Sequence, residues 1–197
     1  FIPSGVNYWR QLRLIGARIK TPRGLLVDLD LDSDLDLLIV TGRPSATHPG
    51  LYLNNGKIFV INVTAFRGSK ICASHIVAAD VLGGRSPEIF FAPTGTSLTD
   101  VRVFRNGSTV PGQPSFLPVV TTNNAYNVVQ PRDFDVTDLD GDGHEDLVSV
   151  TATGSVTYGL SMGASSPTAY SRPQTLLPAS HRSRISAVDL EADGDTD

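Results

Sequence analysis

The sequence predicts an all-β fold, a segment of a β-propeller made of four-stranded antiparallel blades, and three observations support this prediction. Acidic stretches recur at similar intervals along the 197 residues, and each is flanked by short apolar or β-branched runs. Thirteen Pro and 18 Gly residues are scattered through the chain. No long segment has the period of an amphipathic helix. Repeated units of four short strands separated by turn residues are typical of propeller blades.

The composition excludes several classes of protein. Forty per cent of the residues are apolar, which is typical of a globular chain. No apolar run approaches the ~20 residues of a membrane-spanning helix, so we expect no membrane insertion. The single cysteine, Cys72, excludes an intramolecular disulfide framework and a cysteine-rich zinc site.

The acidic residues are unevenly distributed. Seventeen of the 20 are Asp, and 15 lie in the stretches 28–36, 138–146 and 189–197, called loop 1, loop 2 and loop 3 below. Outside these loops, 16 basic residues face five acidic ones. The negative charge is therefore local, and a bound counter-charge is expected to hold it together.

The three loops align as a nine-residue repeat. Positions one, three, five and nine are acidic, and they are Asp28, Asp30, Asp32 and Asp36, then Asp138, Asp140, Asp142 and Asp146, then Asp189, Glu191, Asp193 and Asp197. Position seven is Asp34, His144 or Asp195. A degenerate loop at 80–88 keeps only Asp80 and Glu88, at positions one and nine. The four starting positions are separated by 52, 58 and 51 residues, which indicates a four-fold repeat.

The strands follow the same repeat. Strands are expected before the loops at 24–27, 76–79, 134–137 and 185–188, and after them at 37–40, 89–91 and 147–150. Gly42, Gly95 and Gly154 then mark turns. Third strands are expected at 51–53, 101–104 and 156–160, and fourth strands at 58–63, 116–120 and 171–177. Asn55-Gly56 and Asn106-Gly107 are typical hairpin turns between them.

These elements predict about three full blades and parts of two others. Residues 1–23 would end a preceding blade, and 24–75, 76–130 and 131–182 would be complete blades, the second with the degenerate loop. Residues 183–197 would begin a further blade. Because propellers close with four to eight blades, we expect a part of a larger propeller. A four-bladed ring closed by the two partial blades is the alternative.

The loop chemistry predicts calcium. Crowded carboxylates repel one another unless a cation neutralises them, and oxygen ligands at alternate positions suit Ca²⁺ better than Mg²⁺. Positions one, three, five and nine would bind through side chains, and position seven through its backbone carbonyl. Two to three ions are expected.

Position six and the flanking residues refine this prediction. Gly143 and Gly194 allow the positive φ that folds the loop around an ion, whereas loop 1 has Ser33 there. An EF-hand is excluded, because its bidentate Glu is replaced by Ile39 in loop 1 and Ser149 in loop 2. The degenerate loop is expected to be a metal-free turn.

The stretch from Asp138 to Leu147 resembles the calcium loop of the FG-GAP/VCBS repeat, Asp-x-Asp-x-Asp-Gly-x-x-Asp-Leu. Residues 51–56, Phe59 and Asn62-Val63-Thr64 resemble the strands that follow it. The family includes the integrin α-subunit propeller and fungal propeller lectins. The resemblance implies a seven- or eight-bladed parent with calcium sites on one face. Ser33, Glu191 and the degenerate loop depart from the family pattern.

Other functional motifs are weak. The four histidines share no spacing that indicates a joint site, and no Gly-x-Ser-x-Gly motif is present, so we expect no enzyme. The 13 Arg and three Lys are dispersed, which argues against nucleic-acid binding. Asn62 and Asn106 begin N-glycosylation sequons, so a secreted glycoprotein is plausible.

The sequence therefore predicts an extracellular, calcium-stabilised interaction module, secreted or on the cell surface. Its partners would be the remaining blades and a protein or glycan bound on a propeller face, in adhesion or assembly. A carbohydrate-binding lectin is one alternative, although one Trp among 14 aromatic residues is few for repeated sugar pockets. A propeller part of a polysaccharide-active enzyme is the other.

Overall fold

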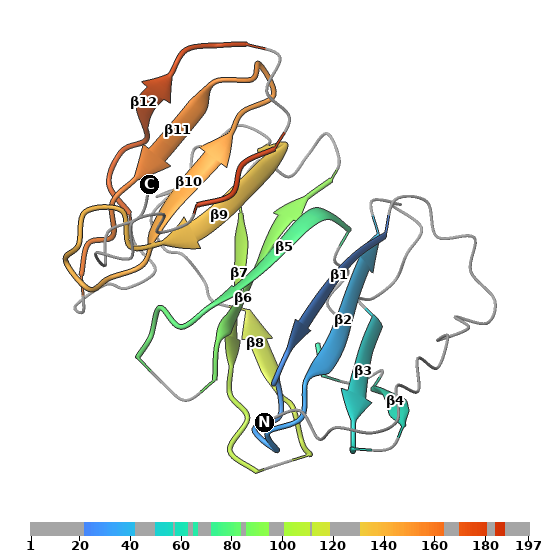
Figure 1. Ribbon diagram of the computed structural model, residues 1–197. Coiled ribbons are helices and arrows are strands. Elements are labelled where there is room, and N and C mark those ends of the chain that lie inside the picture. The colour runs from blue at the N-terminus through green and yellow to red at the C-terminus, as the bar shows by residue number, and fades with distance from the viewer. Residues whose placement is uncertain are drawn as a thin grey trace, which may run out of the picture.

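In the part of the chain that it describes, the computed structural model contains twelve strands and no helix (Figure 1). It describes residues 22–41, 50–56, 58–62, 65–66, 72–83, 86–94, 101–110, 112–118, 131–163, 170–180 and 184–187. The strands are β1 (Pro22–Val27), β2 (Asp36–Thr41), β3 (Gly50–Asn54), β4 (Phe59–Asn62), β5 (Ala73–Ala79), β6 (Glu88–Pro93), β7 (Arg102–Asn106), β8 (Phe116–Pro118), β9 (Asp133–Thr137), β10 (Asp146–Val150), β11 (Val156–Gly159) and β12 (Gln174–Leu177).

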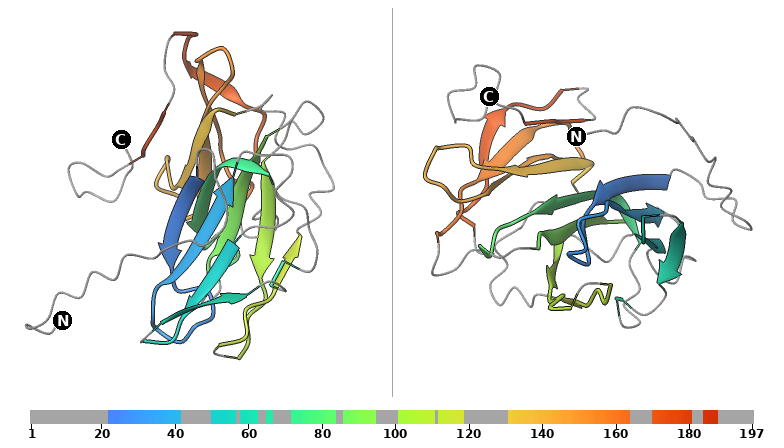
Figure 2. Two further views of the ribbon diagram at one scale, coloured as in Figure 1. Left: turned by 90° about the vertical axis from the view of Figure 1, so that its right-hand side faces the viewer. Right: turned by 60° about the horizontal axis from the view of Figure 1, so that its bottom comes forward.

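The strands form three four-stranded sheets, each in sequential order and antiparallel throughout. We call β1–β4 blade 1, β5–β8 blade 2 and β9–β12 blade 3. Figure 2 shows the three sheets fanned side by side. The prediction of an all-β chain of four-stranded propeller blades is confirmed.

Each pair of neighbouring blades shares an apolar core, because side chains alternate between the two faces of a strand. In β6, Ile89 and Phe91 pack toward blade 1, whereas Phe90 and Ala92 pack toward blade 3. An aromatic cluster strengthens the first of these cores. Its edge-to-face and stacked contacts join Phe66, Phe91, Phe104 and Phe116.

The far face of blade 3 packs against residues 184–187. Val148, Val150 and Val156 are buried there, and Ile185 and Ala187 pack against them. The sequence predicts a strand over 185–188, but the described part, 185–187, has no strand assignment. It runs beside β9 and is attached through carboxylate side chains instead of a backbone ladder, because it faces β9 across a boundary between blades.

The turn predictions have mixed outcomes. Gly154 and Gly56 adopt positive φ, as turn glycines should. Asn106-Gly107 does not form the expected hairpin turn: Gly107 donates its N–H to Ser115 O, and the positive-φ glycine is Gly112. The Asn106 side chain is engaged in a contact with another blade.

Several predicted features lie outside the described residues. These are the strand before residue 22, Gly42, Gly95, Gly194 and all of loop 3, including Asp189, Glu191, Asp193, Asp195 and Asp197. Among the described residues, no helix has the length and apolar character needed to cross a membrane.

Candidate metal centre

Loops 1 and 2 each connect the first two strands of a blade. Asp36 pairs with Val27 at the base of loop 1, and Asp146 pairs with Thr137 at the base of loop 2. The β1–β2, β5–β6 and β9–β10 loops follow one another along one rim of the molecule, from the bottom to the left of Figure 1. The rim therefore carries the acidic residues of the repeat.

The first aspartate shapes each loop by accepting backbone hydrogen bonds. Asp28 Oδ1 accepts from Leu31 N at 2.7 Å, and its Oδ2 accepts from Ser33 N at 3.0 Å. Asp138 does the same with Gly141 N and Gly143 N, both at 2.8 Å. These bonds fold the backbone around the carboxylate and are an Asx-type turn chemistry.

The ninth aspartate ties the loop to the rest of its blade. Asp36 is fully buried, and its carboxylate accepts from Leu29 N at 2.9 Å and Asn54 N at 2.8 Å. Asp146 accepts from Leu139 N at 2.9 Å and Ser161 N at 2.6 Å. Burial raises the pKa of both carboxyls. Position nine is therefore a structural bridge in both loops.

Three carboxylates converge in each loop, but the two sets differ. One oxygen from each of Asp28, Asp30 and Asp32 lies within 4.8 Å of the other two, and loop 2 brings together Asp138, Asp140 and Asp146 in the same way. Of the predicted ligands, the cluster in loop 1 omits Asp36, and that in loop 2 omits Asp142.

Position seven contributes no carboxylate or imidazole to either cluster. Asp34 N and His144 N donate to the carboxylates of Asp32 and Asp142 at 2.9 and 2.8 Å. The side chains of Asp34 and His144 lie beside Gly56 and Gly163, in the hairpins that follow. Binding through the backbone carbonyl of position seven stays a prediction.

Position three distinguishes the two loops. Asp30 is 1% exposed and its Oδ1 has no hydrogen-bond partner, whereas Asp140 is exposed. Burial, reinforced by the charges of Asp36 and Asp32, raises the pKa of Asp30 to about 6. A buried carboxylate oxygen without a donor is rare in folded proteins. Loop 1 therefore has an acceptor that the protein itself does not satisfy.

The residues that adopt the left-handed backbone conformation also differ between the loops. Position six has positive φ in both, at Ser33 (74°) and Gly143 (82°), and so does position four, at Leu31 (66°) and Gly141 (74°). Loop 2 uses glycine at both places, and loop 1 uses neither. Ser33 and Leu31 are therefore strained residues of loop 1, and sequence reasoning missed Leu31.

In the degenerate loop, position nine keeps its hydrogen bond from the backbone N–H of position two. Glu88 is buried, and its Oε2 accepts from Val81 N and Leu82 N, both at 3.2 Å. Residues 80–83 and residues 143–145 of loop 2 line a hollow of about 230 Å³ between blades 2 and 3. Burial, followed by the charges of Asp138 and Asp146, raises the pKa of Glu145 in this hollow.

Two residues of blade 2 contact loop 1. Asn106 Nδ2 donates to Leu29 O at 2.9 Å, and Ser108 Oγ lies 3.2 Å from the same oxygen. Both side chains are buried. The nitrogen to which an N-glycan would be attached is thus used inside the fold, which argues against glycosylation at Asn106.

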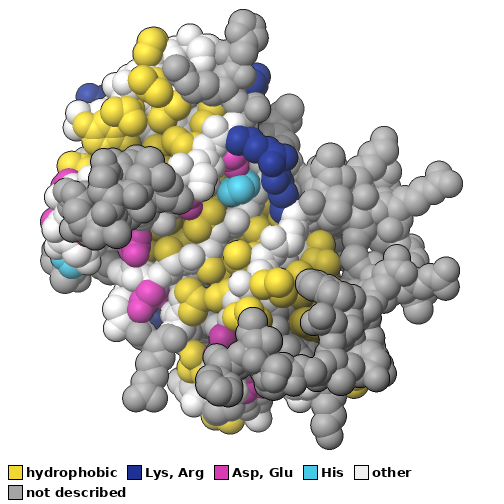
Figure 3. Space-filling view, viewed as in Figure 1, with side chains coloured by type: hydrophobic (Ala, Val, Ile, Leu, Met, Phe, Trp, Pro, Cys, Tyr) yellow, Lys and Arg dark blue, Asp and Glu magenta, His cyan; other side chains and the backbone are white. Residues whose placement is uncertain are grey.

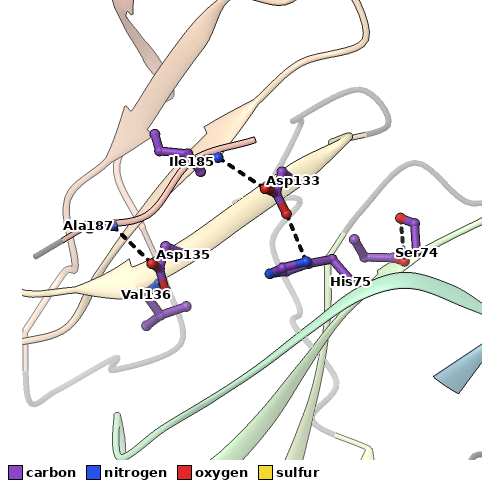
Figure 4. A network of polar contacts seen from close by, with 8 residues as sticks. Ser74, His75, Asp133, Asp135, Val136, Ile185 and Ala187 are labelled. Carbon is purple, nitrogen blue, oxygen red and sulfur yellow. Dashed lines mark hydrogen bonds and ion pairs between the residues drawn. The ribbon is translucent and has the colours of Figure 1, made fainter. Parts of the chain in front are cut away.

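A second network crosses the blades at their first strands (Figure 4). His75 Nδ1 of β5 lies 2.8 Å from Asp133 Oδ1 of β9. The other oxygen of Asp133 accepts from Ile185 N, and Asp135 accepts from Ala187 N, each at 3.0 Å. Ser74 Oγ donates to Ala92 O and does not contact His75 Nδ1, so the described residues here form no serine–histidine pair.

Blade 3 carries an apolar groove of about 390 Å³. It is lined by Val148, Tyr158, Leu176 and Ile185, among others, with Asp140 of loop 2 at its polar side. Apolar side chains gather over this blade in Figure 3. The groove has the mixture of apolar surface and a few polar groups that is typical of ligand sites.

Comparison with known proteins identifies the fold only. No protein-family model matches the sequence, and the comparison with curated proteins gives no match. Among solved structures, a lectin of Agrocybe aegerita, described as recognising non-reducing terminal N-acetylglucosamine, aligns with 80% of this chain at a TM-score of 0.52 and 18% identity. This chain spans 39% of the lectin's length.

A second solved structure is the Tc holotoxin pore of Photorhabdus luminescens. It aligns with 88% of this chain and 8% of its own, at a TM-score of 0.49 and 23% identity. The lectin is a β-propeller, so its likeness supports the propeller fold of the three blades.

Proposed function

We propose that this chain is part of an extracellular propeller of the FG-GAP/VCBS type, in which Ca²⁺ holds loops 1 and 2 and the blades present a binding surface for a partner. The proposal includes no catalytic role. The observation that carries it is Asp30, whose carboxylate converges with two others and whose buried Oδ1 has no hydrogen-bond donor among the described residues.

The donor set of loop 1 fits a hard cation. Asp28, Asp30 and Asp32 offer only oxygen atoms. Ca²⁺ prefers oxygen ligands, whereas softer metals prefer sulfur or nitrogen ligands. The raised pKa of Asp30 reports burial and like-charge repulsion, and a divalent cation would offset both. Both oxygens of Asp28 and one oxygen of Asp32 accept backbone N–H groups of the loop, which fixes the orientation of these two carboxylates.

Loop 2 supports the same chemistry with a more open site. Its three carboxylates converge as closely as those of loop 1, but Asp140 is exposed and Asp146 is buried. Calcium outside cells reaches millimolar concentration, which fills weak sites that cytosolic calcium leaves empty. This is the reason for the extracellular setting in the proposal.

Calcium titration of the chelator-treated chain tests the metal sites. Calorimetry is expected to show at least two sites, with a rise in melting temperature, because a ligand that binds only the folded state stabilises it. Asp30→Asn should remove the site of loop 1 and keep that of loop 2. A folded chain that binds no calcium at millimolar concentration would overturn the proposal.

Protein binding and carbohydrate binding are the two candidate activities. Adhesion or assembly through a protein partner is the general expectation for such a surface. Carbohydrate binding is favoured by the fold shared with the lectin and by the groove beside loop 2, where Tyr158 offers an aromatic face next to Asp140. The proposed ligand class is a sugar with a non-reducing terminal residue.

A glycan array in calcium separates these candidates. Binding of terminal N-acetylglucosamine or a related sugar, weakened by Tyr158→Ala and retained by Tyr158→Phe, would support the lectin function in this groove. The phenol of Tyr158 donates to Gln174 Oε1 at 3.1 Å, so the Phe variant tests the ring without this bond. A silent array would leave the protein-binding function as the proposal.

A further inference from the structure

The backbone of loop 1 is held by a side chain from the neighbouring blade. Leu29 lies between the carboxylates of Asp28 and Asp30 and is fully buried, and its carbonyl oxygen accepts from Asn106 Nδ2 at 2.9 Å. Asn106 ends β7 of blade 2, 77 residues away in the sequence. The contact therefore joins the segment that carries two of the three converging carboxylates to another blade.

The orientation of the Asn106 amide is fixed by Ser108. Asn106 Oδ1 accepts from Ser108 N at 3.0 Å and lies 2.5 Å from Ser108 Oγ. A carboxamide whose oxygen is held in this way can present only its nitrogen to Leu29 O. The Ser108 hydroxyl itself accepts from Ser115 N at 3.2 Å, so the β7–β8 hairpin supports the arrangement. We call Asn106 and Ser108 the interblade latch.

The equivalent residue of blade 1 behaves differently. Asn54 Nδ2 donates at 3.3 Å to Leu35 O, within its own blade and at an exposed position. Among the described residues, no side chain from another blade is hydrogen-bonded to Leu139 O, the counterpart of Leu29 O in loop 2. Within the described part of the chain, Asn106 and Ser108 are therefore hydrogen-bonded to loop 1 and not to loop 2.

The latch acts where loop 1 is strained. Leu31 and Ser33 follow Leu29 in the left-handed region, and conformations of this kind persist only when the surrounding structure holds them. Asp30, the residue after Leu29, is itself buried. Releasing Leu29 would let the strained segment relax and turn the Asp30 carboxylate away from Asp28 and Asp32.

We propose that Asn106 is a positioning residue for the metal site of loop 1, acting through Leu29, so that the packing of blade 2 on blade 1 sets the metal affinity of that loop. The inference rests on the calcium binding proposed above. Residues that hold a metal ligand in place without touching the metal typically change the metal affinity by about 10- to 100-fold when they are substituted.

The test is a Ca²⁺ titration of the full chain followed by amide NMR, which reports on each loop separately. The amide of Ser33 reports on loop 1 and that of Gly143 on loop 2, because each donates to the first aspartate of its loop. Asn106→Ala is expected to weaken binding at loop 1 by about 10-fold or more and to leave loop 2 within about two-fold. Ser108→Ala should give a smaller loss at loop 1.

Ser149→Ala is the matched control. It breaks a buried hydrogen bond of 3.0 Å between Ser149 and Thr157 in blade 3, away from the latch. We expect it to lower the melting temperature and to change neither affinity. The control separates a general loss of stability from a loss of positioning.

Each outcome decides between the hypotheses. If wild-type amides of neither loop respond to Ca²⁺, the proposed function fails and the latch cannot be a positioning device for calcium. If both loops bind and Asn106→Ala weakens them equally or not at all, the function stands and the latch inference is wrong. If Asn106→Ala does not fold, the milder Ser108→Ala decides, and an unchanged loop 1 affinity in it overturns the inference.

Discussion

Loops 1 and 2 share a nine-residue pattern but reach it by different physical means. Loop 2 places glycine at both positions of positive φ and exposes Asp140. Loop 1 places Leu31 and Ser33 at those positions, buries Asp30 and is held by Asn106 of the next blade. The comparison indicates that the two copies of the motif keep the same hydrogen-bond frame, while the residues at positions four and six determine the strain and the burial of position three differs between the copies.

The strain of loop 1 can be expressed as a free-energy cost. A left-handed conformation at a non-glycine residue costs about 1–2 kcal/mol. With two such residues, loop 1 is less stable than loop 2 as an isolated turn and depends more on its surroundings. The following tests are ordered by the size of the expected effect.

The largest effect is expected where the loops agree. Asp36→Ala and Asp146→Ala each leave two backbone N–H groups without their acceptor, and each unsatisfied buried group costs about 1–3 kcal/mol. Urea denaturation in chelator should show a loss of roughly 2–5 kcal/mol for both. A much smaller loss for Asp36→Ala would show that position nine is not a common frame.

Asp30→Asn should change the stability of the chain in opposite directions with and without calcium. In chelator at pH 7, Asp30→Asn removes a buried charge and should stabilise the chain by roughly 1–2 kcal/mol. In calcium it should abolish the stabilisation from loop 1. Asp140→Asn, being exposed, should be near neutral in chelator.

The pH dependence of the same pair follows from the raised pKa. The folded pKa of Asp30, about 6, exceeds its ordinary value of 3.8, so the chelated wild type gains stability as the pH falls between these values. The advantage of Asp30→Asn in urea melts should therefore shrink on acidification from pH 7. An advantage that grows would contradict the burial of this carboxylate.

Because the two loops place different residue types in the left-handed conformation, substitutions at these positions should change the stability in opposite directions. Ser33→Gly should stabilise loop 1 by about 1 kcal/mol, and Gly143→Ala should destabilise loop 2 by about 1–2 kcal/mol. No atom lies within 4 Å of a Cβ added at Gly143, so the loss would be conformational. Thermal melts in chelator measure both changes. If both substitutions shift the melting temperature in the same direction, strain does not explain the difference between the loops.

The smallest effect concerns the network away from both loops. Burial lowers the pKa of His75 despite the opposing charge of Asp133, and Arg23 and Arg184 lower it further. The neutral form is favoured in the folded state, so the stability that His75 contributes falls as the pH drops below its ordinary pKa of 6.5. Wild type should lose up to about 1 kcal/mol relative to His75→Gln between pH 7.5 and 5.5, measured by urea denaturation. A constant difference would show that His75 does not titrate in this range.

Much of the candidate site was predictable because its determinants are local. The alternation of acids in residues 28–36 and 138–146 predicted two carboxylate clusters at strand connections, and Gly143 predicted a left-handed turn. The ligand sets were less predictable, since Asp36 and Asp146 each accept two backbone N–H groups, yet only Asp146 belongs to the carboxylate cluster of its loop.

The sequence by itself determined the strand order, the blades and the positions of the acidic loops, because strand period, turn residues and Asx hydrogen bonds act over a few residues. Only the tertiary structure decided that Asp30 is buried without a donor, that Asn106 bonds to Leu29 and that Asp133 joins His75 to Ile185. These contacts link residues tens of positions apart. They depend on how blades pack, and no local pattern records which side chain the neighbouring blade will present.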